Sequence, residues 1–349
     1  MSEPKISVCI PTYNGEEYIA ECLDSILVQT YDNFEILIID DDSSDSTLEI
    51  AHSYAIKDKR IRIIKNKVNL GLVGNWNHCI KLSKGEWIKF VFHDDLIEPN
   101  CLERMLVVAN NDHCFVVCRR NFIFSNVSEE IKREYQKFSN EISMDGIFKG
   151  KTDITPKDIV NAQLKIGVHY QRNYFGEPTA TLIHRDLFSQ FGTFNSALIQ
   201  KCDLEYWLRL SLNIGVRYIP ETLAHFRVHK GATTARNKLG REFRMRELDH
   251  LVMLHEYIYN PLFLPLKIAD ASHDKLLTRK LIGKKSRWVY NQAKAAAHRA
   301  SNPDKSLLAE WNNLLTVYPL LSKTFYFRFY QLHDYINSRF LWRLNNKNY

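Results

Sequence analysis

Residues 87–95 read Trp-Ile-Lys-Phe-Val-Phe-His-Asp-Asp, an apolar run that ends in two adjacent carboxylates. The run from Trp87 to Phe92 predicts a buried strand, and Asp94 and Asp95 follow it directly. Open α/β folds bind their ligands at the edge where such strands end. Carboxylate oxygens there suit Mg²⁺ or Mn²⁺, which can bridge the phosphates of a nucleotide. The pair could instead end the strand and cap the next helix, so the surrounding sequence has to decide.

The sequence before this strand alternates between apolar and helical segments. Strands are expected at Lys5 to Ile10, Phe34 to Ile39 and Ile61 to Lys65, and helices at Glu17 to Gln29, Ser46 to Ala55 and Asn75 to Leu82. Strands that are apolar on both faces and alternate with helices predict a mostly parallel sheet that is covered on two sides. The polar loops that follow these strands should therefore meet at one edge of the sheet.

A second acidic loop, Asp40-Asp41-Asp42, follows the strand that begins at Phe34. Three buried carboxylates in a row would be costly, so at least one should face a hydrogen-bond donor or solvent. A carboxylate at a strand end can accept the N3–H of uracil or thymine, or a ribose hydroxyl. A turn with a helix cap explains Asp42 to Asp45 well, but explains Asp40 and Asp41 less well.

The periodicity weakens after about Phe115. Residues 126–158 are polar and predict loops and short helices, a strand is expected at Thr179 to Ile183, and a helix at Leu204 to Leu212. Beyond Arg241 the pattern is mostly helical. We therefore expect a catalytic domain over residues 1–240 and a helical, basic region over residues 241–349.

Charge is divided unevenly along the 349 residues. Residues 231–349 carry 20 Lys+Arg and 9 Asp+Glu, against 27 and 31 in residues 1–230, so the net charges are +11 and −4. Tyr318 to Tyr349 interleaves aromatic residues with cations, a pattern that suits an anionic membrane surface. A helical bundle packed on the catalytic domain and an oligomer interface, including a homo-oligomer, remain alternatives. Nucleic-acid binding is not expected, because the front part is acidic and carries no recognition motif.

The seven cysteines form no CxxC pair, and the chain begins with a polar segment rather than a signal peptide. This usage predicts reduced thiols, no zinc site and a cytoplasmic location, with peripheral attachment to the inner face of the membrane as an option. The sequence contains no stretch of 18 uninterrupted apolar residues, so we expect no membrane-spanning helix.

An ordered series of motifs gives the chain a family resemblance over roughly residues 5 to 235. The motifs are Val8–Asn14, Asp40–Asp45, Asn69–Gly71 with Asn77, Gly85–Phe90, His93–Asp95, Gly192–Phe194, Cys202–Arg209 and Phe226–His229. In this order they resemble the inverting glycosyltransferases of family 2, which have the GT-A fold, a Rossmann-like α/β sheet. The resemblance does not cover the chain beyond about residue 240.

The resemblance implies transfer of a sugar from a nucleotide-diphosphate sugar, most simply a UDP sugar, to a hydroxyl acceptor, with dTDP and GDP left open. Asp41 would pair with the base, with Asp40 behind it. The implied nucleotide-sugar-binding residues are Pro11, Thr12, Tyr13, Asn14, Asp40, Asp41, Asn69, Gly71, Asn77, Asp94 and Arg227. The acceptor would be a glycan or a lipid-linked glycan in the synthesis of a surface polysaccharide.

The resemblance also implies a metal site and a general base. Asp95 would coordinate Mg²⁺ or Mn²⁺ on the diphosphate, Asp94 would reach the ribose or the metal, and His229 would join the metal shell. Asp203 would take the proton from the acceptor hydroxyl, since inversion needs one displacement, one base and no protein nucleophile. Plain structural readings are a helix-capping carboxylate for Asp203 and a satisfied structural histidine for His229.

The chain departs from the family pattern at three positions. Phe92 stands where an aspartate is usual, Trp76 where an arginine is common, and Asp42 where glycine is frequent.

Two other functions fit parts of the sequence. A nucleotidyltransferase would need a glycine- and basic-rich phosphate loop after the first strand, which residues 11–14 do not supply. A catalytically silent scaffold is favoured by Phe92 and opposed by Asp95 and Asp203.

Overall fold

The computed structural model describes residues 4–110, 114–166, 172–232, 244–270, 275–297 and 307–333. Its contacts divide the chain into one unit of Met1–Ser196 with Cys202–Arg236 and another of Ala197–Lys201 with Asn237–Tyr349. The expected domain boundary at residue 240 lies outside the described residues.

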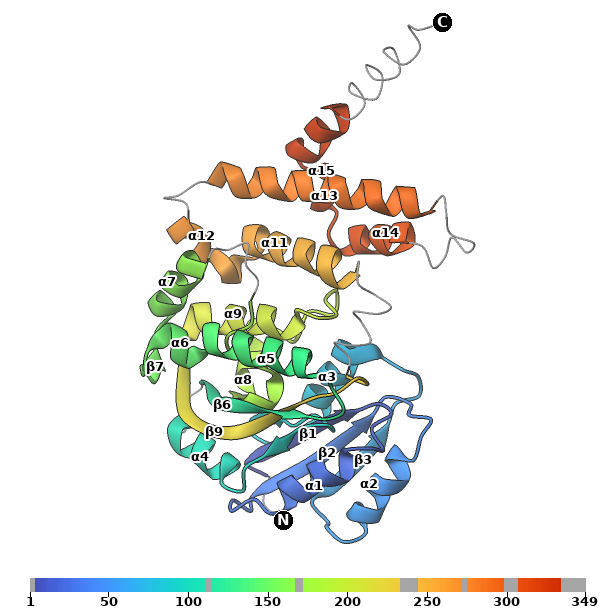
Figure 1. The fold of residues 1–349 in the computed structure, drawn as a ribbon, viewed down its shortest axis with the longest axis vertical. Coiled ribbons are helices and arrows are strands. Elements are labelled where there is room, and N and C mark those ends of the chain that lie inside the picture. Colours follow the sequence, from blue (N-terminus) through green and yellow to red (C-terminus); the bar gives the residue numbers. More distant parts are fainter. Residues whose placement is uncertain are drawn as a thin grey trace, which may run out of the picture. The chain divides into compact units, whose positions relative to one another are not determined.

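The first unit is built on a mixed sheet (Figure 1). Its described strands run in the order β3 (Ile61–Lys65), β2 (Phe34–Asp40), β1 (Ile6–Thr12), β4 (Trp87–Phe90), β8 (Thr181–His184), β6 (Phe115–Phe124), β9 (Val216–Val228) and β5 (Leu96–Ile97), while β7 (Asp153–Ile154) also pairs with β9. The four strands from β3 to β4 are parallel, as the alternating sequence indicates. Strand β8 is antiparallel to both β4 and β6, which makes the sheet mixed.

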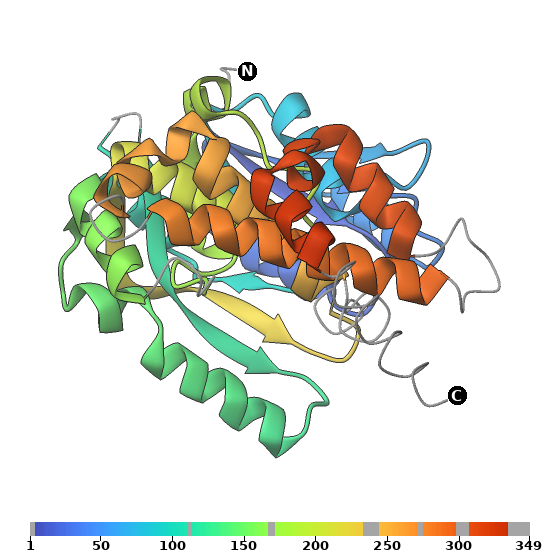
Figure 2. The ribbon, with the colours of Figure 1, turned by 90° about the horizontal axis from the view of Figure 1, so that it is seen from above.

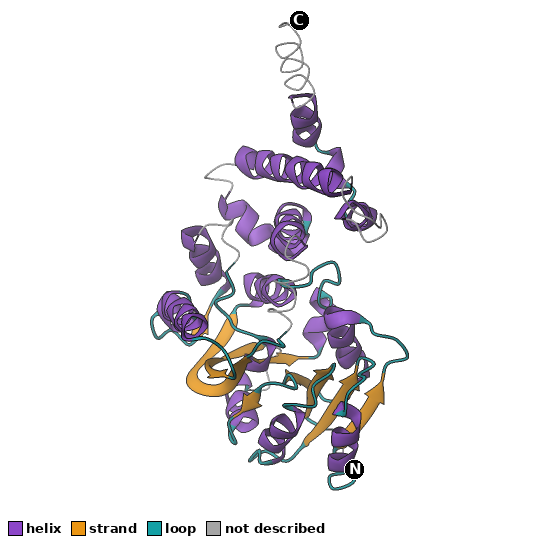
Figure 3. Cartoon of the chain, turned by 45° about the vertical axis from the view of Figure 1, so that its right-hand side comes forward, coloured by secondary structure: helices purple, strands orange, loops and turns teal. Residues whose placement is uncertain are grey.

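Helices cover both faces of this sheet (Figure 3). The helices α1 (Ile19–Leu27), α2 (Thr47–Ala55) and α4 (Cys101–Ala109) share one apolar core with alternate residues of β1 and β2. The helices α3 (Gly71–Leu82), α8 (Asp186–Phe191) and α9 (Cys202–Ile214) contact the sheet elsewhere, α3 at β1 and β2 and α9 at β6. All seven residues of β2 are buried, which explains the apolar run Ile36–Ile39 between Glu35 and Asp40.

The parallel register brings three strand ends together. Thr12 at the end of β1 pairs with Asp40 at the end of β2. On the other side of β1, Cys9 pairs with Phe90, the last residue of β4. The loops that begin at residues 13, 41 and 91 therefore leave the same edge of the sheet, as predicted.

The sequence missed the two longest described strands. Strands β6 and β9 pair in parallel over most of their length and appear side by side in Figure 2. Their register shifts twice near Arg119, opposite the stretch of β9 that contains Pro220, and a bulge of this kind disrupts the alternation that marks a strand. The polar stretch predicted as loops and short helices contains α5 (Glu129–Glu141), α6 (Met144–Phe148) and α7 (Pro156–Ile166), and α5 is longer than expected.

The described part of the second unit is helical, which confirms the expected helical C-terminal region. It contains a π-helical turn (Arg244–Leu248), α11 (Asp249–Tyr259), α12 (Leu264–Asp270), α13 (Lys275–Ala297), α14 (Leu307–Val317), α15 (Leu320–Lys323) and the helical residues 325–333. Trp311, Leu321 and Phe327 are buried in its core. Of the helices in the described residues, none has both the length and the apolar character that a membrane span requires.

Candidate active site

The loops that follow β1, β2 and β4 are bonded and packed against one another. The backbone N–H of Asn14 donates to Oγ of Ser43 at 2.9 Å, and the N–H of Ser44 donates to Oδ1 of Asn14 at 2.9 Å. A Cβ atom at Gly15 would lie 2.4 Å from Cδ2 of His93, so only glycine leaves room for that imidazole ring. The three loops thus form one continuous wall at the carboxyl edge.

Asp41 ties the loop after β2 to the beginning of α3. Its Oδ1 accepts from Nδ2 of Asn66 at 2.8 Å and from the N–H of Leu70 at 2.7 Å, and its Oδ2 accepts from the N–H of Gly71 at 2.9 Å. Asn69 donates from Nδ2 to the carbonyl oxygen of Asp41 at 2.9 Å. The structure therefore brings three predicted nucleotide-binding residues, Asp41, Asn69 and Gly71, into one cluster.

The other predicted base contacts differ in exposure. Asp40 is fully buried, and its Oδ2 accepts from the N–H of Ser43 at 3.0 Å. Pro11 and Thr12 are buried within β1, whereas Tyr13 is 37% exposed. Of the Pro11-Thr12-Tyr13 motif, Tyr13 is therefore the residue whose side chain can reach a ligand without rearrangement.

Asn77 is placed away from this cluster. Its Nδ2 donates to the carbonyl oxygen of Phe194 at 2.9 Å, and its Oδ1 accepts from the N–H of Phe194 at 3.0 Å. Both ends of the amide therefore hold the Gly192–Phe194 motif against α3. In this arrangement Asn77 acts on the backbone, and its predicted contact with the nucleotide sugar stays a prediction.

The departures from the family pattern at positions 76 and 92 touch each other. The rings of Trp76 and Phe92 lie 4.9 Å apart between centroids, and Trp76 also packs on Phe194 at 5.1 Å. An apolar contact thus occupies the place where an arginine and an aspartate are usual. The third departure, Asp42, has a φ of 66°, a left-handed conformation that glycine adopts without strain.

Asp94 and His229 lie side by side in the loop after β4 and at the end of β9. Nε2 of His229 is 3.0 Å from Oδ2 of Asp94, and the edge of the Tyr18 ring packs against the imidazole. Burial opposes ionisation of Asp94, but the neighbouring His93 and the hydrogen bond from His229 outweigh it, so the pKa of Asp94 lies below its ordinary value. Asp94 is therefore held as a carboxylate.

Asp95 points into the protein. Its side chain is fully buried, its Oδ2 accepts from the hydroxyl of Thr179, and its Oδ1 accepts from the N–H of Arg227 at 2.9 Å. Burial, followed by the charge of Asp94, raises the pKa of Asp95 well above its ordinary value. Its predicted role as a metal ligand stays a prediction, but its partners are those of a residue that supports the loop.

The side chain of Arg227 also bonds other groups of the protein. Its guanidinium donates to the carbonyl oxygen of Asp94 at 2.8 Å, to Oγ of Ser125 at 3.2 Å and to Oε2 of Glu21 at 2.6 Å, and it lies over the ring of Tyr18. All three nitrogens have partners. Arg227 therefore positions the backbone of Asp94, and its predicted contact with the nucleotide sugar would require it to exchange one of these bonds.

Asp203 lies in the first turn of α9, where hydrogen bonds from Asn173 and Leu204 help to orient it. Its Oδ2 accepts from Nδ2 of Asn173 at 2.8 Å, and its Oδ1 accepts from the N–H of Leu204 at 2.6 Å. Asn173 also donates to the carbonyl oxygen of Gly176, to which Nε1 of Trp207 donates at 3.1 Å. The segment 173–176 therefore holds the carboxylate of Asp203 in place.

The segment immediately before Asp203 is held by α11 within the second unit. Asp249 is fully buried, and its Oδ2 accepts from the N–H groups of Ile199 at 3.1 Å, Gln200 at 2.7 Å and Lys201 at 3.2 Å. Arg244 donates to the carbonyl oxygen of Ala197. Desolvation raises the pKa of Asp249 above its ordinary value. The backbone donors and the charge of Arg244 act in the opposite direction and stabilise the carboxylate.

A divalent ion fits Asp94 and His229 as a partial set of ligands. Within the described ranges, no three side chains of His, Cys, Asp or Glu gather as a complete metal site. Mg²⁺ bound with a nucleotide usually takes only one or two carboxylates from the protein, and the phosphates and water supply the remaining oxygens. One ionised carboxylate with an adjacent imidazole meets that requirement.

Sequence reasoning missed the residues that support this site. Thr179, Asn173 and Asn66 each bind a predicted carboxylate, and Asp249 binds the segment before Asp203. Each contact joins parts of the chain that are 25 to 84 residues apart. No local pattern marks such a residue, because its role depends on how the strands pair.

Comparison with known proteins identifies close likenesses in sequence. The model of the family described as "Glycosyl transferase family 2" matches residues 7–188. A Mycobacterium tuberculosis protein, uncharacterized protein MT1568, is 32% identical over 248 residues, which cover 69% of this chain and 74% of that protein. The putative glycosyltransferase EpsH of Bacillus subtilis is 36% identical over 155 residues, 43% of this chain and 45% of EpsH.

Solved structures share the fold at low identity. TarS of S. aureus, residues 1–349 in complex with UDP-GlcNAc, has a TM-score of 0.56 and 17% identity, and covers 89% of this chain and 79% of its own. The mannosyltransferase PcManGT from Pyrobaculum calidifontis, in complex with GDP-Man and Mn²⁺, has a TM-score of 0.52 and 18% identity, covering 95% and 84%. These likenesses establish the GT-A fold.

Proposed function

The chain belongs to glycosyltransferase family 2, and from that premise we propose that it is a metal-dependent, inverting transferase. It moves a sugar from a nucleotide-diphosphate sugar to a hydroxyl of a glycan or lipid-linked glycan. The product belongs to a surface polysaccharide or a related glycan. A nucleotidyltransferase is no longer favoured, because the family match accounts for the same carboxylates.

The contact between Asp94 and His229 carries the metal-dependent part of this proposal. The ionised Asp94 and the imidazole of His229 would hold Mg²⁺ or Mn²⁺ on the donor diphosphate. A bound divalent ion would offset the negative charge that grows on the diphosphate as it leaves. Asp95 and Arg227 hold the loop that carries Asp94, because the N–H of Arg227 donates to Asp95 and its guanidinium donates to the carbonyl oxygen of Asp94. We therefore place Asp94, rather than Asp95, first among the metal ligands.

Asp203 is the proposed general base. Its carboxylate takes the proton from the acceptor hydroxyl while that oxygen attacks the anomeric carbon, and the bond from this carbon to the diphosphate oxygen breaks on the opposite side. One displacement inverts the anomeric centre and needs no covalent intermediate on the protein. Asn173 and the N–H of Leu204 keep the carboxylate oriented for this step.

The donor is proposed to carry UDP. Asp41 lies at the junction of the β2 loop and α3, where it would accept the N3–H of uracil in exchange for one of its present donors. Tyr13 is exposed and follows Thr12, whose carbonyl oxygen accepts from the N–H of Asp41 at 2.8 Å, and it would stack on the base. TarS, with the same fold, is described in complex with UDP and with UDP-GlcNAc, whereas PcManGT is described with GDP-Man, so GDP is the main competitor.

Thermal unfolding with UDP, dTDP, GDP and CDP, each with and without Mn²⁺, tests the donor proposal. We expect one nucleotide, UDP, to stabilise the protein only when Mn²⁺ is present. At 100 times its Kd a ligand stabilises the folded state by about 2.7 kcal/mol, which raises the Tm by several degrees for a protein of this size. No shift with any nucleotide would favour the catalytically silent scaffold.

Two neighbouring substitutions distinguish the metal ligand from its support. Asp94→Asn should abolish the part of the shift that needs Mn²⁺ and leave the Tm of the free protein nearly unchanged. Asp95→Asn should retain the Mn²⁺-dependent shift, since Asp95 is buried and bonded to Thr179 and to the N–H of Arg227. The opposite pattern would show that Asp95 is the ligand.

We further propose that the second unit attaches to an anionic membrane surface near a lipid-linked acceptor. Phe325, Phe329 and Leu332 are 72%, 50% and 58% exposed and are spaced along one helical face of residues 325–333. Arg328 lies between them in the sequence, within the basic part of the chain. Of the segment Tyr318 to Tyr349 that the sequence indicates for this role, the second half, residues 334–349, lies outside the described residues.

Flotation with vesicles of phosphatidylcholine and phosphatidylglycerol tests this attachment. Wild type should float with anionic vesicles and stay behind with pure phosphatidylcholine, and changing Phe325, Phe329 and Leu332 to Ser should reduce the floating fraction severalfold. Ending the chain near Tyr318 would be a poorer test, because it removes the buried Leu321 and Phe327.

A matched control changes three exposed apolar residues of the first unit to Ser. Ile56, Val68 and Val107 are 86%, 61% and 64% exposed, and their removal should leave flotation unchanged. Equal flotation of all three proteins, or flotation of none, would contradict the proposal.

A further inference from the structure

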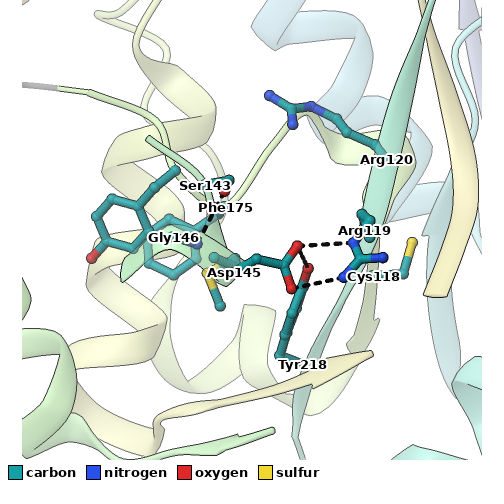
Figure 4. A pocket seen from close by; sticks show the side chains of 10 residues that line it. Cys118, Arg119, Arg120, Ser143, Asp145, Gly146, Phe175 and Tyr218 are labelled. Atoms are coloured by element: carbon teal, nitrogen blue, oxygen red, sulfur yellow. Dashed lines mark hydrogen bonds and ion pairs between the residues drawn. The ribbon is translucent and has the colours of Figure 1, made fainter. Parts of the chain in front are cut away.

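A cavity of about 430 Å³ opens between β6, α6 and the segment that contains Tyr174 and Phe175 (Figure 4). None of its lining residues belongs to the loops that follow β1, β2 and β4. Its volume falls in the range of small-molecule sites. The donor site proposed above does not account for it.

Arg119, Asp145 and Tyr218 form a hydrogen-bonded triad in this cavity (Figure 4). Nε and Nη2 of Arg119 donate to the carboxylate of Asp145 at 2.8 and 3.0 Å, and the hydroxyl of Tyr218 donates to the same carboxylate at 2.7 Å. The hydrogen bond from Arg119, together with that from Tyr218, holds the pKa of Asp145 below its ordinary value despite partial burial. Nη1 of Arg119 has no hydrogen-bond partner among the described residues.

The charges around the cavity are balanced. Asp145 neutralises Arg119, and Glu177 neutralises the other lining arginine, Arg120. An anionic ligand such as a phosphate would have to approach the carboxylate of Asp145. A neutral ligand with many hydroxyl groups can donate to that carboxylate and accept from Nη1 of Arg119 at once, which is the pattern that a sugar offers.

One wall of the cavity belongs to the segment that supports the proposed base. Tyr174 and Phe175, whose rings stack with centroids 4.3 Å apart, lie between Asn173 and Gly176 in the chain. Asn173 donates to Asp203, and Gly176 accepts from Trp207 of α9. Residues 173–176 therefore connect the two places: Tyr174 and Phe175 line the cavity, and Asn173 binds the carboxylate of Asp203.

We propose that this cavity is an acceptor subsite, which binds an uncharged sugar unit of the acceptor through Arg119, Asp145 and Tyr218. The proposal rests on the function proposed above, since it extends the acceptor side of the same reaction. The bound unit lies next to the sugar that carries the attacking hydroxyl. The subsite fixes the acceptor and does not touch the donor.

Two reactions measured on the same variants test this subsite. The first reaction is hydrolysis of the donor by water, which needs the donor site alone. The second is sugar transfer to an acceptor, which also needs the subsite. The acceptors are the methyl glycosides of glucose, galactose, mannose and N-acetylglucosamine, and their β-1,4-linked disaccharides. The donors are UDP-glucose, UDP-galactose, UDP-N-acetylglucosamine and GDP-mannose. We expect Arg119→Gln and Asp145→Asn to raise the acceptor KM about tenfold to a hundredfold, as expected for lost charge-assisted hydrogen bonds, with donor hydrolysis unchanged. Tyr218→Phe, which removes one hydroxyl, should raise it less.

Arg104→Gln is the matched control, because Arg104 makes a similar partly exposed ion pair with Glu221 outside the cavity. It should change neither reaction. Equal loss of hydrolysis and transfer in the Arg119 and Asp145 variants would make the triad merely structural and overturn the subsite. The subsite would also be overturned if the wild type hydrolyses a donor but transfers sugar to no glycoside and shows no contact with any glycoside in saturation-transfer NMR. A third outcome is that the wild type hydrolyses none of the donors but contacts a glycoside in the NMR experiment, and that Asp145→Asn abolishes this contact. That outcome would uphold the subsite and contradict the proposed function.

Discussion

Asp203→Asn is expected to lower the rate of sugar transfer by about three orders of magnitude, within the range of 10² to 10⁴ that a general base contributes. The amide can still accept hydrogen bonds from Asn173 and Leu204, so the variant should keep the local structure. What it loses is the ability to accept a proton from the acceptor hydroxyl. The rate of nucleotide release with a sugar acceptor measures this directly.

The same variant should bind the donor as wild type does. Its Mn²⁺-dependent thermal shift with the nucleotide should stay within experimental error, since the bonds of Asp94 to His229 and of Asp41 to the start of α3 do not involve Asp203. Asp186→Asn, which changes a carboxylate in the first turn of α8, is the control and should transfer normally. Transfer by Asp203→Asn within a few fold of wild type would return Asp203 to the role of a helix-capping residue.

Asp249→Ala is expected to reduce both stability and transfer, although Asp249 lies in the helical C-terminal region. The change leaves the N–H groups of Ile199, Gln200 and Lys201 without their acceptor. A fully buried donor that loses its partner costs about 1–3 kcal/mol, and these three residues are half-buried, so the free energy of unfolding should fall by on the order of 3 kcal/mol in total. Urea unfolding measures this loss.

Transfer by this variant should fall further than its stability explains, at temperatures where it is fully folded. Lys201 is two residues before Asp203, so a loosened segment 197–201 misplaces the proposed base. Glu256→Ala is the matched control: Glu256 is buried on the same helix but bonds Asn260. If both variants lose stability and neither loses transfer when folded, α11 has no part in positioning the base.

The parallel half of the fold and the identity of the acidic loops could be predicted from the sequence. Strands β1, β2 and β4 are short and buried, so their apolar runs mark them, and the carboxylates that follow β2 and β4 are visible by position. Strands β6 and β9 escaped because their exposure is mixed and a register shift interrupts their pairing. Their partners are also distant in the chain, and a strand whose signal is long-range pairing has no local mark.

The different surroundings of Asp94 and Asp95 could not be read from the sequence either. The two residues are identical and adjacent, and only the turn after β4 decides that Asp95 is fully buried against Thr179 while Asp94 meets His229. Likewise Arg227 and Asn77 were sequence candidates for the nucleotide sugar, but the fold engages their side chains with Asp94, Glu21 and Phe194. Polar residue type predicts where chemistry is located, and hydrogen-bond partners decide which residue is available for it.

The contact between Trp76 and Phe92 makes these two positions an epistatic pair. An arginine at 76 alone would press a guanidinium against the rings of Phe90, Phe92 and Phe194, and an aspartate at 92 alone would set a carboxylate against an indole ring. Each single exchange is disfavoured, while the double exchange restores a matched pair. A chimera that takes its β4 loop from a relative with aspartate at this position must therefore inherit α3 from the same parent.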